Sequence, residues 1–243
     1  MIRLDKFLAD SGLGSRTQVK DLLKKGQVRV NGQIEKQAKK QIDETVDQVQ
    51  VAGKDVSYEK YVYYMLNKPK GVITARQDPE RKTVLDLLDP QAFGKGVSPV
   101  GRLDLNTHGL LLLTNNGPLS HAMLSPKKHV SKRYRAHVNG IMNQDDIKVF
   151  REGIVFKDFT SLPAELEILE VDERNHRCVV DITIAEGKFH QVKRMVQACG
   201  KNVTDLQRLT MGPLVLDPGL ELGDYRRLHA DEMKELETFQ VEL

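Results

Sequence analysis

Apolar residues recur at helical spacing in two stretches at the start of the chain. Leu4, Phe7 and Leu8 mark the first helix, because residues three and four positions apart share one helical face. Ser15 followed by Gln18 has the form of a capping box and predicts the start of a second helix. Two short amphipathic helices are therefore expected to open the chain.

A β-hairpin is predicted directly after these helices. Residues 28–34 alternate around an Asn-Gly pair, which favours a tight two-residue turn. A polar stretch near residue 57 then separates this part from a differently patterned remainder. We therefore expect a small helix-helix-hairpin domain over residues 1–57 and a second domain over residues 58–243.

The second domain mixes strand and helix patterns without a regular β-α-β repeat. The predicted strands cover residues 62–66, 73–75, 110–113, 134–138, 166–171, 177–184, 206–209 and 214–216. The predicted helices cover residues 83–88, 118–124, 145–152, 192–199 and 230–236. Such a mixture predicts an α+β fold with a mixed, largely antiparallel sheet.

Composition adds little to this picture. With 37 Lys and Arg against 34 Asp and Glu the net charge is +3, which permits a polyanionic partner without requiring one. Cys178 and Cys199 lack any Cys-x-x-Cys partner, and we interpret both as buried thiols of a reducing compartment. The start of the chain lacks a signal-peptide pattern, and no apolar stretch approaches the ~18 residues of a membrane span. We therefore expect a cytoplasmic protein without membrane contact.

The most informative candidate for chemistry is Asp104. It follows Arg102 and Leu103 and precedes the apolar run of residues 110–113. A carboxylate at the lip of a buried strand, with a cation two residues earlier, can act as a nucleophile. The same pattern also describes an ordinary Asp in a polar turn before a core strand, and the triplet alone does not decide between the two.

Two further segments carry candidate side chains. Tyr134 begins a predicted strand after two cations, where the pattern alone indicates a packing residue. Lys193 lies outside the apolar stripe of its predicted helix, where the spacing alone indicates a solvated cation. His108 and His190 lack the His-Glu-x-x-His or paired-carboxylate spacing of a metal site, so no metal is expected.

Six segments taken together resemble the RsuA-type pseudouridine synthases, which act on ribosomal RNA. The segments are residues 1–8, 65–71, 101–104, 132–134, 186–195 and 211–214. Each motif is weak alone, whereas their order and spacing along the whole chain make the match specific.

The resemblance implies specific roles for residues of the second domain. Asp104 would be the catalytic carboxylate, Tyr134 would stack on the target base, and Lys193 would pair with Asp104. Arginine is common at the last position in relatives, and an ammonium cannot form a bidentate fork, so its hold on the carboxylate should be looser. The residues that would bind substrate are Arg102, Lys68, Lys70, His190, Gln191 and the pocket-lining Leu209. Isomerisation of uridine gains and loses no atoms, so no cofactor is expected.

The resemblance also identifies the first domain as similar to S4 RNA-binding domains. Its exposed cations are Arg16, Lys20, Lys24, Lys25 and Arg29. A charged stripe of this kind is often only a solvated face, but in an S4 domain it would contact RNA phosphates, which position a protein without reading sequence.

The expected activity is the isomerisation of one uridine in 16S ribosomal RNA, the uridine conventionally numbered 516. Two features favour 16S over 23S RNA: the His-Gln-Val-Lys sequence at residues 190–193, and the short C-terminus without a basic tail. The alternatives are a synthase acting on 23S RNA and a catalytically silent S4-type RNA-binding protein. The expected partner is ribosomal RNA, naked or in an assembling small subunit, and we expect a monomer.

Overall fold

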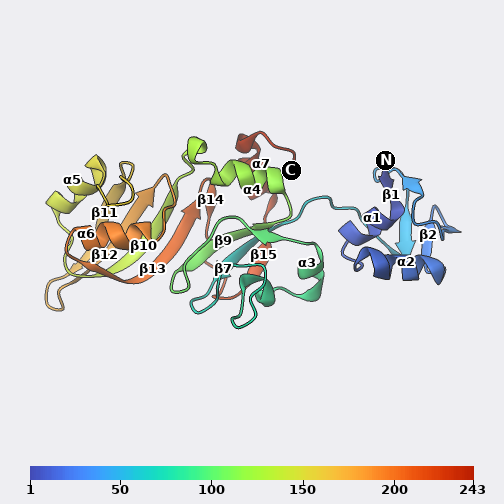
Figure 1. Cartoon of the computed structure of the whole chain (residues 1–243), viewed down its shortest axis with the longest axis horizontal. Helices are drawn as coiled ribbons and strands as arrows, with labels where there is room; N and C mark the ends of the chain where they lie inside the picture. Colours follow the sequence, from blue (N-terminus) through green and yellow to red (C-terminus); the bar gives the residue numbers. More distant parts are fainter. The chain divides into compact units, whose positions relative to one another are not determined.

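The computed structural model describes residues 1–243, and the chain divides into two compact units (Figure 1). The N-terminal unit comprises Met1–Val62 with Leu88–Val97, and the C-terminal unit comprises Tyr63–Leu87 with Ser98–Leu243. The Tyr58 ring stacks on Phe7 with their centroids 5.2 Å apart, so the N-terminal core includes a residue just beyond position 57. The domain boundary at that position remains a prediction.

The N-terminal unit contains two helices followed by a hairpin. In α2 (Arg16–Lys24) the Ser15 hydroxyl accepts a hydrogen bond from the Gln18 backbone N–H at 3.4 Å, and the Gln18 side chain accepts one from the Ser15 N–H at 2.7 Å. This is the reciprocal capping box that the sequence predicts. The hairpin turn has positive φ at both residues, which suits the Asn-Gly pair. The other elements of this region are α1 (Leu4–Asp10), β1 (Ile2–Arg3), β2 (Val28–Val30), β3 (Gln33–Ile34), β4 (Gln41–Ile42), β5 (Val49–Val51) and β6 (Lys54–Asp55).

The core of this unit is apolar. The helices contribute their predicted stripes, and the strands close the other side. The buried residues are Ile2, Leu4, Phe7, Leu8, Val19, Leu23, Val28, Val30, Ile42 and Val49.

A nine-stranded sheet forms the C-terminal unit. Seven strands run in the order β11-β12-β10-β13-β9-β7-β15, while β14 pairs with β13 and β8 with β9. Every pair is antiparallel except β9 and β13, which run parallel at the centre of the sheet. The strands are β7 (Tyr63–Lys68), β8 (Ser98–Pro99), β9 (His108–Thr114), β10 (Lys132–Asn139), β11 (Glu165–Asp172), β12 (Arg177–Ile184), β13 (Asn202–Met211), β14 (Leu214–Val215) and β15 (Tyr225–Arg227).

Short helices lie in the connections between these strands, and the last two follow β15. They are the 3-10 helix η1 (Val84–Leu87), α3 (Pro90–Gly94), α4 (Gly117–Leu124), η2 (Pro126–Lys128), α5 (Gln144–Glu152), α6 (Gln191–Ala198), α7 (Ala230–Leu236) and η3 (Glu237–Phe239). Of these helices, α3 lies within Leu88–Val97 and belongs to the N-terminal unit. The expectation of an α+β fold with a mixed, largely antiparallel sheet is confirmed. No helix reaches the length and hydrophobicity that a bilayer crossing requires.

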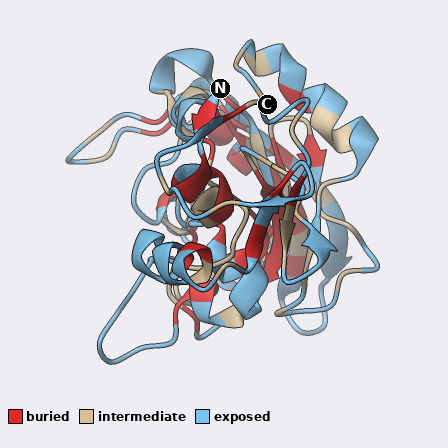
Figure 2. Ribbon diagram, turned by 90° about the vertical axis from the view of Figure 1, so that its right-hand side faces the viewer, coloured by how far each residue is buried: buried red, intermediate tan, exposed pale blue.

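Burial follows the sheet. Figure 2 shows buried residues concentrated on the strands and on the inner sides of helices, with the connecting loops exposed. The sequence 110–113, expected as a central strand, is fully buried within β9. Strands with neighbours on both sides and covered faces read as continuous apolar runs, as this one does.

Several details of the predicted elements are wrong; the strand predicted over residues 206–209, for example, is longer and covers Asn202–Met211 as β13. Residues 73–75 form no strand, because Ile73 makes only an isolated bridge to Thr83. The strand predicted to stop at residue 66 continues to Lys68, because pairing with β9 extends it. Asn67 and Lys68 are polar, so the apolar pattern in the sequence ends two residues before the strand does.

Both cysteines are free thiols. Cys178 is buried, and its thiol donates to the Gly140 carbonyl at 3.3 Å. Cys199 is only partly buried, and this burial raises its pKa to about 11, which keeps the thiol protonated at neutral pH.

Candidate active site

Asp104 lies in the loop that connects β8 to β9, directly before the parallel pair at the centre of the sheet. The fully buried Lys68 ammonium donates to three carbonyls, those of Pro69 (3.0 Å), Asp104 (3.2 Å) and Thr107 (3.0 Å). Burial lowers the pKa of Lys68 to about 8. These three hydrogen bonds tie the Lys68 ammonium to the backbone and stabilise the Asp104 loop, and that Lys68 binds substrate stays a prediction.

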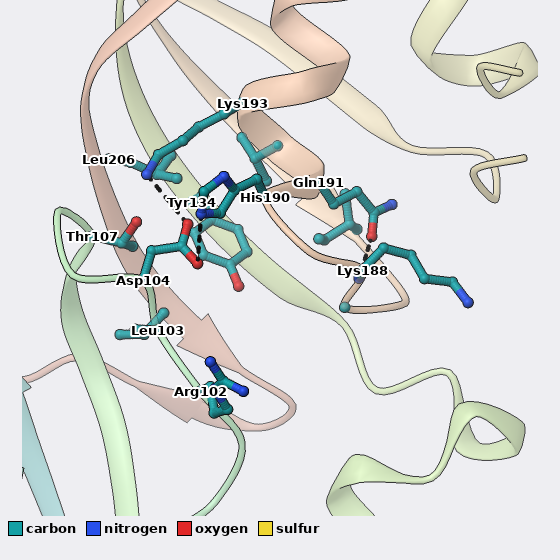
Figure 3. Close-up of a pocket in the computed structure, with 13 residues that line it drawn as sticks. Arg102, Leu103, Asp104, Thr107, Tyr134, Lys188, His190, Gln191, Lys193 and Leu206 are labelled. Atoms are coloured by element: carbon teal, nitrogen blue, oxygen red, sulfur yellow. Dashed lines mark hydrogen bonds and ion pairs between the residues drawn. The ribbon is translucent and has the colours of Figure 1, made fainter. Parts of the chain in front are cut away.

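Two basic side chains face the Asp104 carboxylate (Figure 3). Lys193 Nζ donates to Oδ2 at 3.2 Å, and His190 Nε2 lies 3.6 Å from Oδ1. All three side chains are partly exposed, so the cluster opens to solvent. The structure thus brings together Asp104, Lys193 and His190, three of the residues predicted from sequence.

The start of α6 positions these two basic side chains. Val192, Met195 and Val196 are buried, which turns Lys193 away from the core and toward the carboxylate. His190 is the N-cap residue with φ 52°, a left-handed conformation that costs free energy in a non-glycine residue.

Gln191 fixes the turn that precedes this helix. Its buried side chain accepts a hydrogen bond from the Lys188 N–H at 3.0 Å and donates to Glu186 Oε1 at 2.7 Å. Glu186 Oε1 also accepts from the Leu162 N–H at 2.8 Å. Gln191 lines the pocket, but its polar atoms form hydrogen bonds within the turn that precedes α6.

Tyr134 lies on β10 beside the carboxylate, and its side chain is 8% exposed. Leu206 lines the same pocket from β13, whereas Leu209 does not. Arg208 pairs with Tyr134 and Leu206 with Ala136, and the register between the strands shifts at Leu209, which lies between the partners of Arg133 and Tyr134. The role of Leu209 stays a prediction.

The pocket around Asp104 has a volume of about 80 Å³. Arg102 lines it as an exposed cation, while Lys70 lies outside it. Lys70 instead pairs with Asp205, which also contacts His108 Nε2 at 3.0 Å. That Arg102 and Lys70 bind substrate stays a prediction. The lining residues that the sequence did not single out are Leu103, Thr107, Ile184, Gly187, Lys188, Val192 and Leu206.

No cluster of three or more His, Cys, Asp or Glu residues has a geometry that could hold a metal ion. Chemically, the pocket offers one carboxylate, an ammonium that orients it, and an aromatic ring beside both. This arrangement suits a nucleophile or base acting on a planar ligand.

In the N-terminal unit, the five predicted RNA-binding cations are all exposed. Arg29 donates to the Gly32 carbonyl at 2.8 Å, and none of the five forms an ion pair within 4.0 Å. Their charges are therefore available to an external anion. The residues are Arg16, Lys20, Lys24, Lys25 and Arg29.

Comparison with known proteins gives consistent matches along the chain. The family described as RNA pseudouridylate synthase matches residues 62–198, and the S4 domain matches residues 2–47. A crystal structure of a pseudouridylate synthase superposes with a TM-score of 0.66 at 35% identity, covering 97% of this chain and 100% of that one.

Similar sequences cover nearly the full length. The RNA pseudouridine synthase YtzG of Bacillus subtilis is 44% identical, covering 96% of this chain and 97% of its own length. Ribosomal large subunit pseudouridine synthase B of the same organism is 37% identical (97% and 96% covered), as is ribosomal small subunit pseudouridine synthase A of Haemophilus influenzae (97% and 99% covered).

Proposed function

Because this chain belongs to the RNA pseudouridine synthase family and carries an S4 domain, we propose that it isomerises a uridine of ribosomal RNA with Asp104 as the catalytic carboxylate. The observation that carries the proposal is the Asp104 carboxylate, held at 3.2 Å by Lys193 and flanked by Tyr134 in an open pocket. The family membership predicted from sequence motifs is confirmed.

The reaction breaks the bond between uracil N1 and ribose C1′, turns the base, and joins C5 to C1′, while C5 loses its proton and N1 takes one up. Asp104 starts it by adding to C1′, by adding to the base, or by removing a ribose proton. In each route the carboxylate must be ionised and aimed, and the Lys193 ammonium serves both needs. Tyr134 offers a flat face for the uracil ring once the nucleotide has left its stack.

Within ribosomal RNA, we propose a 16S target at the uridine conventionally numbered 516. The His-Gln-Val-Lys sequence of residues 190–193 supports this choice, as does the small-subunit relative. The equally similar large-subunit relative favours 23S RNA as the alternative. The proposal includes a monomer that acts in the cytoplasm on naked RNA or on an assembling small subunit.

Asp104→Asn should abolish isomerisation while RNA affinity stays within a few-fold, because the amide keeps the shape but is neither nucleophile nor base. Release of tritium from RNA labelled at uridine C5 measures the activity, and filter binding measures the affinity. Asp145→Asn, at an exposed helix terminus outside the pocket, is the matched control and should behave as wild type. Substantial tritium release by the Asp104 variant would remove this residue from the mechanism.

The target is tested separately by mapping pseudouridines in ribosomal RNA from cells with and without this protein. Loss of the modification at uridine 516 of 16S RNA is expected. Loss of a 23S site instead would select the alternative, and an unchanged map would favour a catalytically silent RNA-binding protein.

A further inference from the structure

A second cavity adjoins the Asp104 pocket, and Tyr134 lines both. It has a volume of about 440 Å³ and lies beside the segment that joins α4 to η2. Apolar side chains, including Met123, Leu124 and Met211, form much of its wall. The proposed catalytic steps make no use of this cavity.

Two cations, one buried and one half-buried, face this cavity. Arg208 is 2% exposed; its Nε donates to the Leu110 carbonyl at 2.8 Å, while its Nη2 is buried without any partner. The half-buried Lys132 donates from Nζ only to the Val130 carbonyl at 2.8 Å. Neither cation has a carboxylate within 4.0 Å.

Charges removed from water in proteins are normally paired, because moving an isolated ion out of water is costly. The one carboxylate that lines the cavity, Glu186, is already bound by Gln191 and by the Leu162 N–H. The cost is apparent at Lys132, whose pKa is lowered to about 8 by burial and by the charge of Arg208. The cavity therefore holds two positive charges that lack a counter-ion.

The sheet places both cations beside the Tyr134 ring. Lys132 precedes Tyr134 by two positions on β10, and Arg208 is the register partner of Tyr134 on β13. Residues two apart on a strand, and residues opposite each other on neighbouring strands, share one face of the sheet. A nucleotide with its base on Tyr134 would therefore have its backbone close to both cations.

We infer that this cavity is a phosphate subsite, in which Lys132 and Arg208 bind a phosphodiester of the RNA strand next to the uridine held at Tyr134. The inference rests on the proposed function, since it takes RNA as the ligand. It assigns Lys132 and Arg208 to substrate positioning: they hold the backbone while Asp104 acts on the nucleotide.

The test combines a neutral side chain with a neutral phosphate. Lys132→Met keeps the aliphatic stem and removes the charge, and synthetic RNAs carry one methylphosphonate linkage at successive positions around the target uridine. Affinity is measured by fluorescence anisotropy, independently of turnover. Loss of one charge-assisted hydrogen bond predicts a roughly ten- to hundredfold weaker Kd. At one linkage, Lys132→Met combined with the methylphosphonate should weaken RNA binding no more than either change alone.

Additive losses at every linkage, or an unaltered Kd for Lys132→Met, would overturn the inference. Lys128→Met, an exposed cation outside the cavity, is the matched control and should remain additive at that linkage. Arg208→Lys keeps a charge without the planar fork and should give an intermediate loss; if it fails to fold, Lys132→Met decides alone. Tritium release by the wild-type protein reports on the proposed function separately, so failure of either proposal can be recognised.

Discussion

At the scale of single residues, the site depends on two lysines with opposite tasks. Lys68 is sealed inside the protein and holds the backbone of the Asp104 loop through three carbonyls, whereas Lys193 is partly exposed and holds the carboxylate itself. Lys68 therefore determines the position of the carboxylate, and Lys193 stabilises its charge and sets its orientation.

Lys193→Met should lower kcat roughly ten- to hundredfold, because one charge-assisted hydrogen bond to the carboxylate is lost. Lys193→Arg should retain most activity, since it keeps the charge. Lys148→Met, an exposed lysine on α5, serves as the control. Steady-state tritium release gives kcat for each variant, and an unaltered kcat for Lys193→Met would mean that Lys193 is only a solvated cation.

Lys68 should leave a signature in the pH dependence of stability. Its pKa falls from 10.5 when unfolded to about 8 when folded, so between these values the unfolded chain binds more protons and the free energy of unfolding rises with pH. The rise should reach at most about 3 kcal/mol, and Lys68→Met should lack it. Urea titrations at pH 8 and above should therefore show a widening difference in the free energy of unfolding between wild type and variant. With Lys148→Met as the control, that difference should stay constant.

Asp104, Tyr134 and Lys193 could be named from the sequence because each lies in a recognisable local motif, and their roles stay predictions. The surroundings of Lys68 and Lys70 could not be predicted, because a lysine in a turn gives the same pattern whether its ammonium contacts substrate, a carbonyl or a carboxylate. Only the pairing of β7 with β9 shows that Lys68 points inward, and only β13 supplies Asp205 as the partner of Lys70.

At the scale of secondary-structure elements, the parallel contact between β9 and β13 determines the position of the site. Gly109 has φ 103°, and a Cβ there would lie 2.4 Å from the Arg208 carbonyl oxygen. Only glycine allows the two strands to approach so closely.

Gly109→Ala should destabilise the protein by about 2 kcal/mol or more, because both the overpacking and the backbone conformation are unfavourable. It should also reduce turnover, since the Asp104 loop leads into this strand. Gly117→Ala is the matched control, because a Cβ there meets no atom within 4 Å. Urea unfolding and tritium release measure the two effects, and a variant as stable as the control would show that the strands can separate without cost.

Element types were predictable where periodicity was strong, as in β12 and α7, whose observed bounds match the sequence pattern. Leu209 lies outside the pocket that Leu206 lines, at a point where the register between β10 and β13 shifts near Arg133 and Tyr134. A shift of this kind changes which side chain faces the pocket, and no single-strand pattern reveals it.

At the scale of the whole molecule, the exposed cations of the N-terminal unit are expected to contribute to RNA affinity through phosphates. Replacing all five by Gln in the full-length chain should flatten the dependence of log Kd on log salt concentration. The slope should fall by up to about 0.7 for each phosphate that the variant no longer neutralises. The five residues are Arg16, Lys20, Lys24, Lys25 and Arg29.

The matched control removes the same charge from the C-terminal unit. The control replaces five of the exposed cations of that unit by Gln: Lys148, Arg151, Lys157, Arg174 and Arg177. Filter binding across a salt series should give a wild-type slope for this control. Equal slopes for both variants would mean that net charge alone matters and that the N-terminal stripe is a solvated face.

The distance along the chain between Asp104 and Lys193 also orders events during synthesis. The two residues are 89 positions apart, and at 5–20 residues per second the ribosome takes about 4 to 18 s to add the second after the first. The core of the N-terminal unit and its basic helix, by contrast, come entirely from segments made before Asp104. A growing chain therefore exposes its cationic helix for many seconds while its carboxylate still lacks the ammonium that orients it, so any attraction for polyanions precedes the capacity for chemistry.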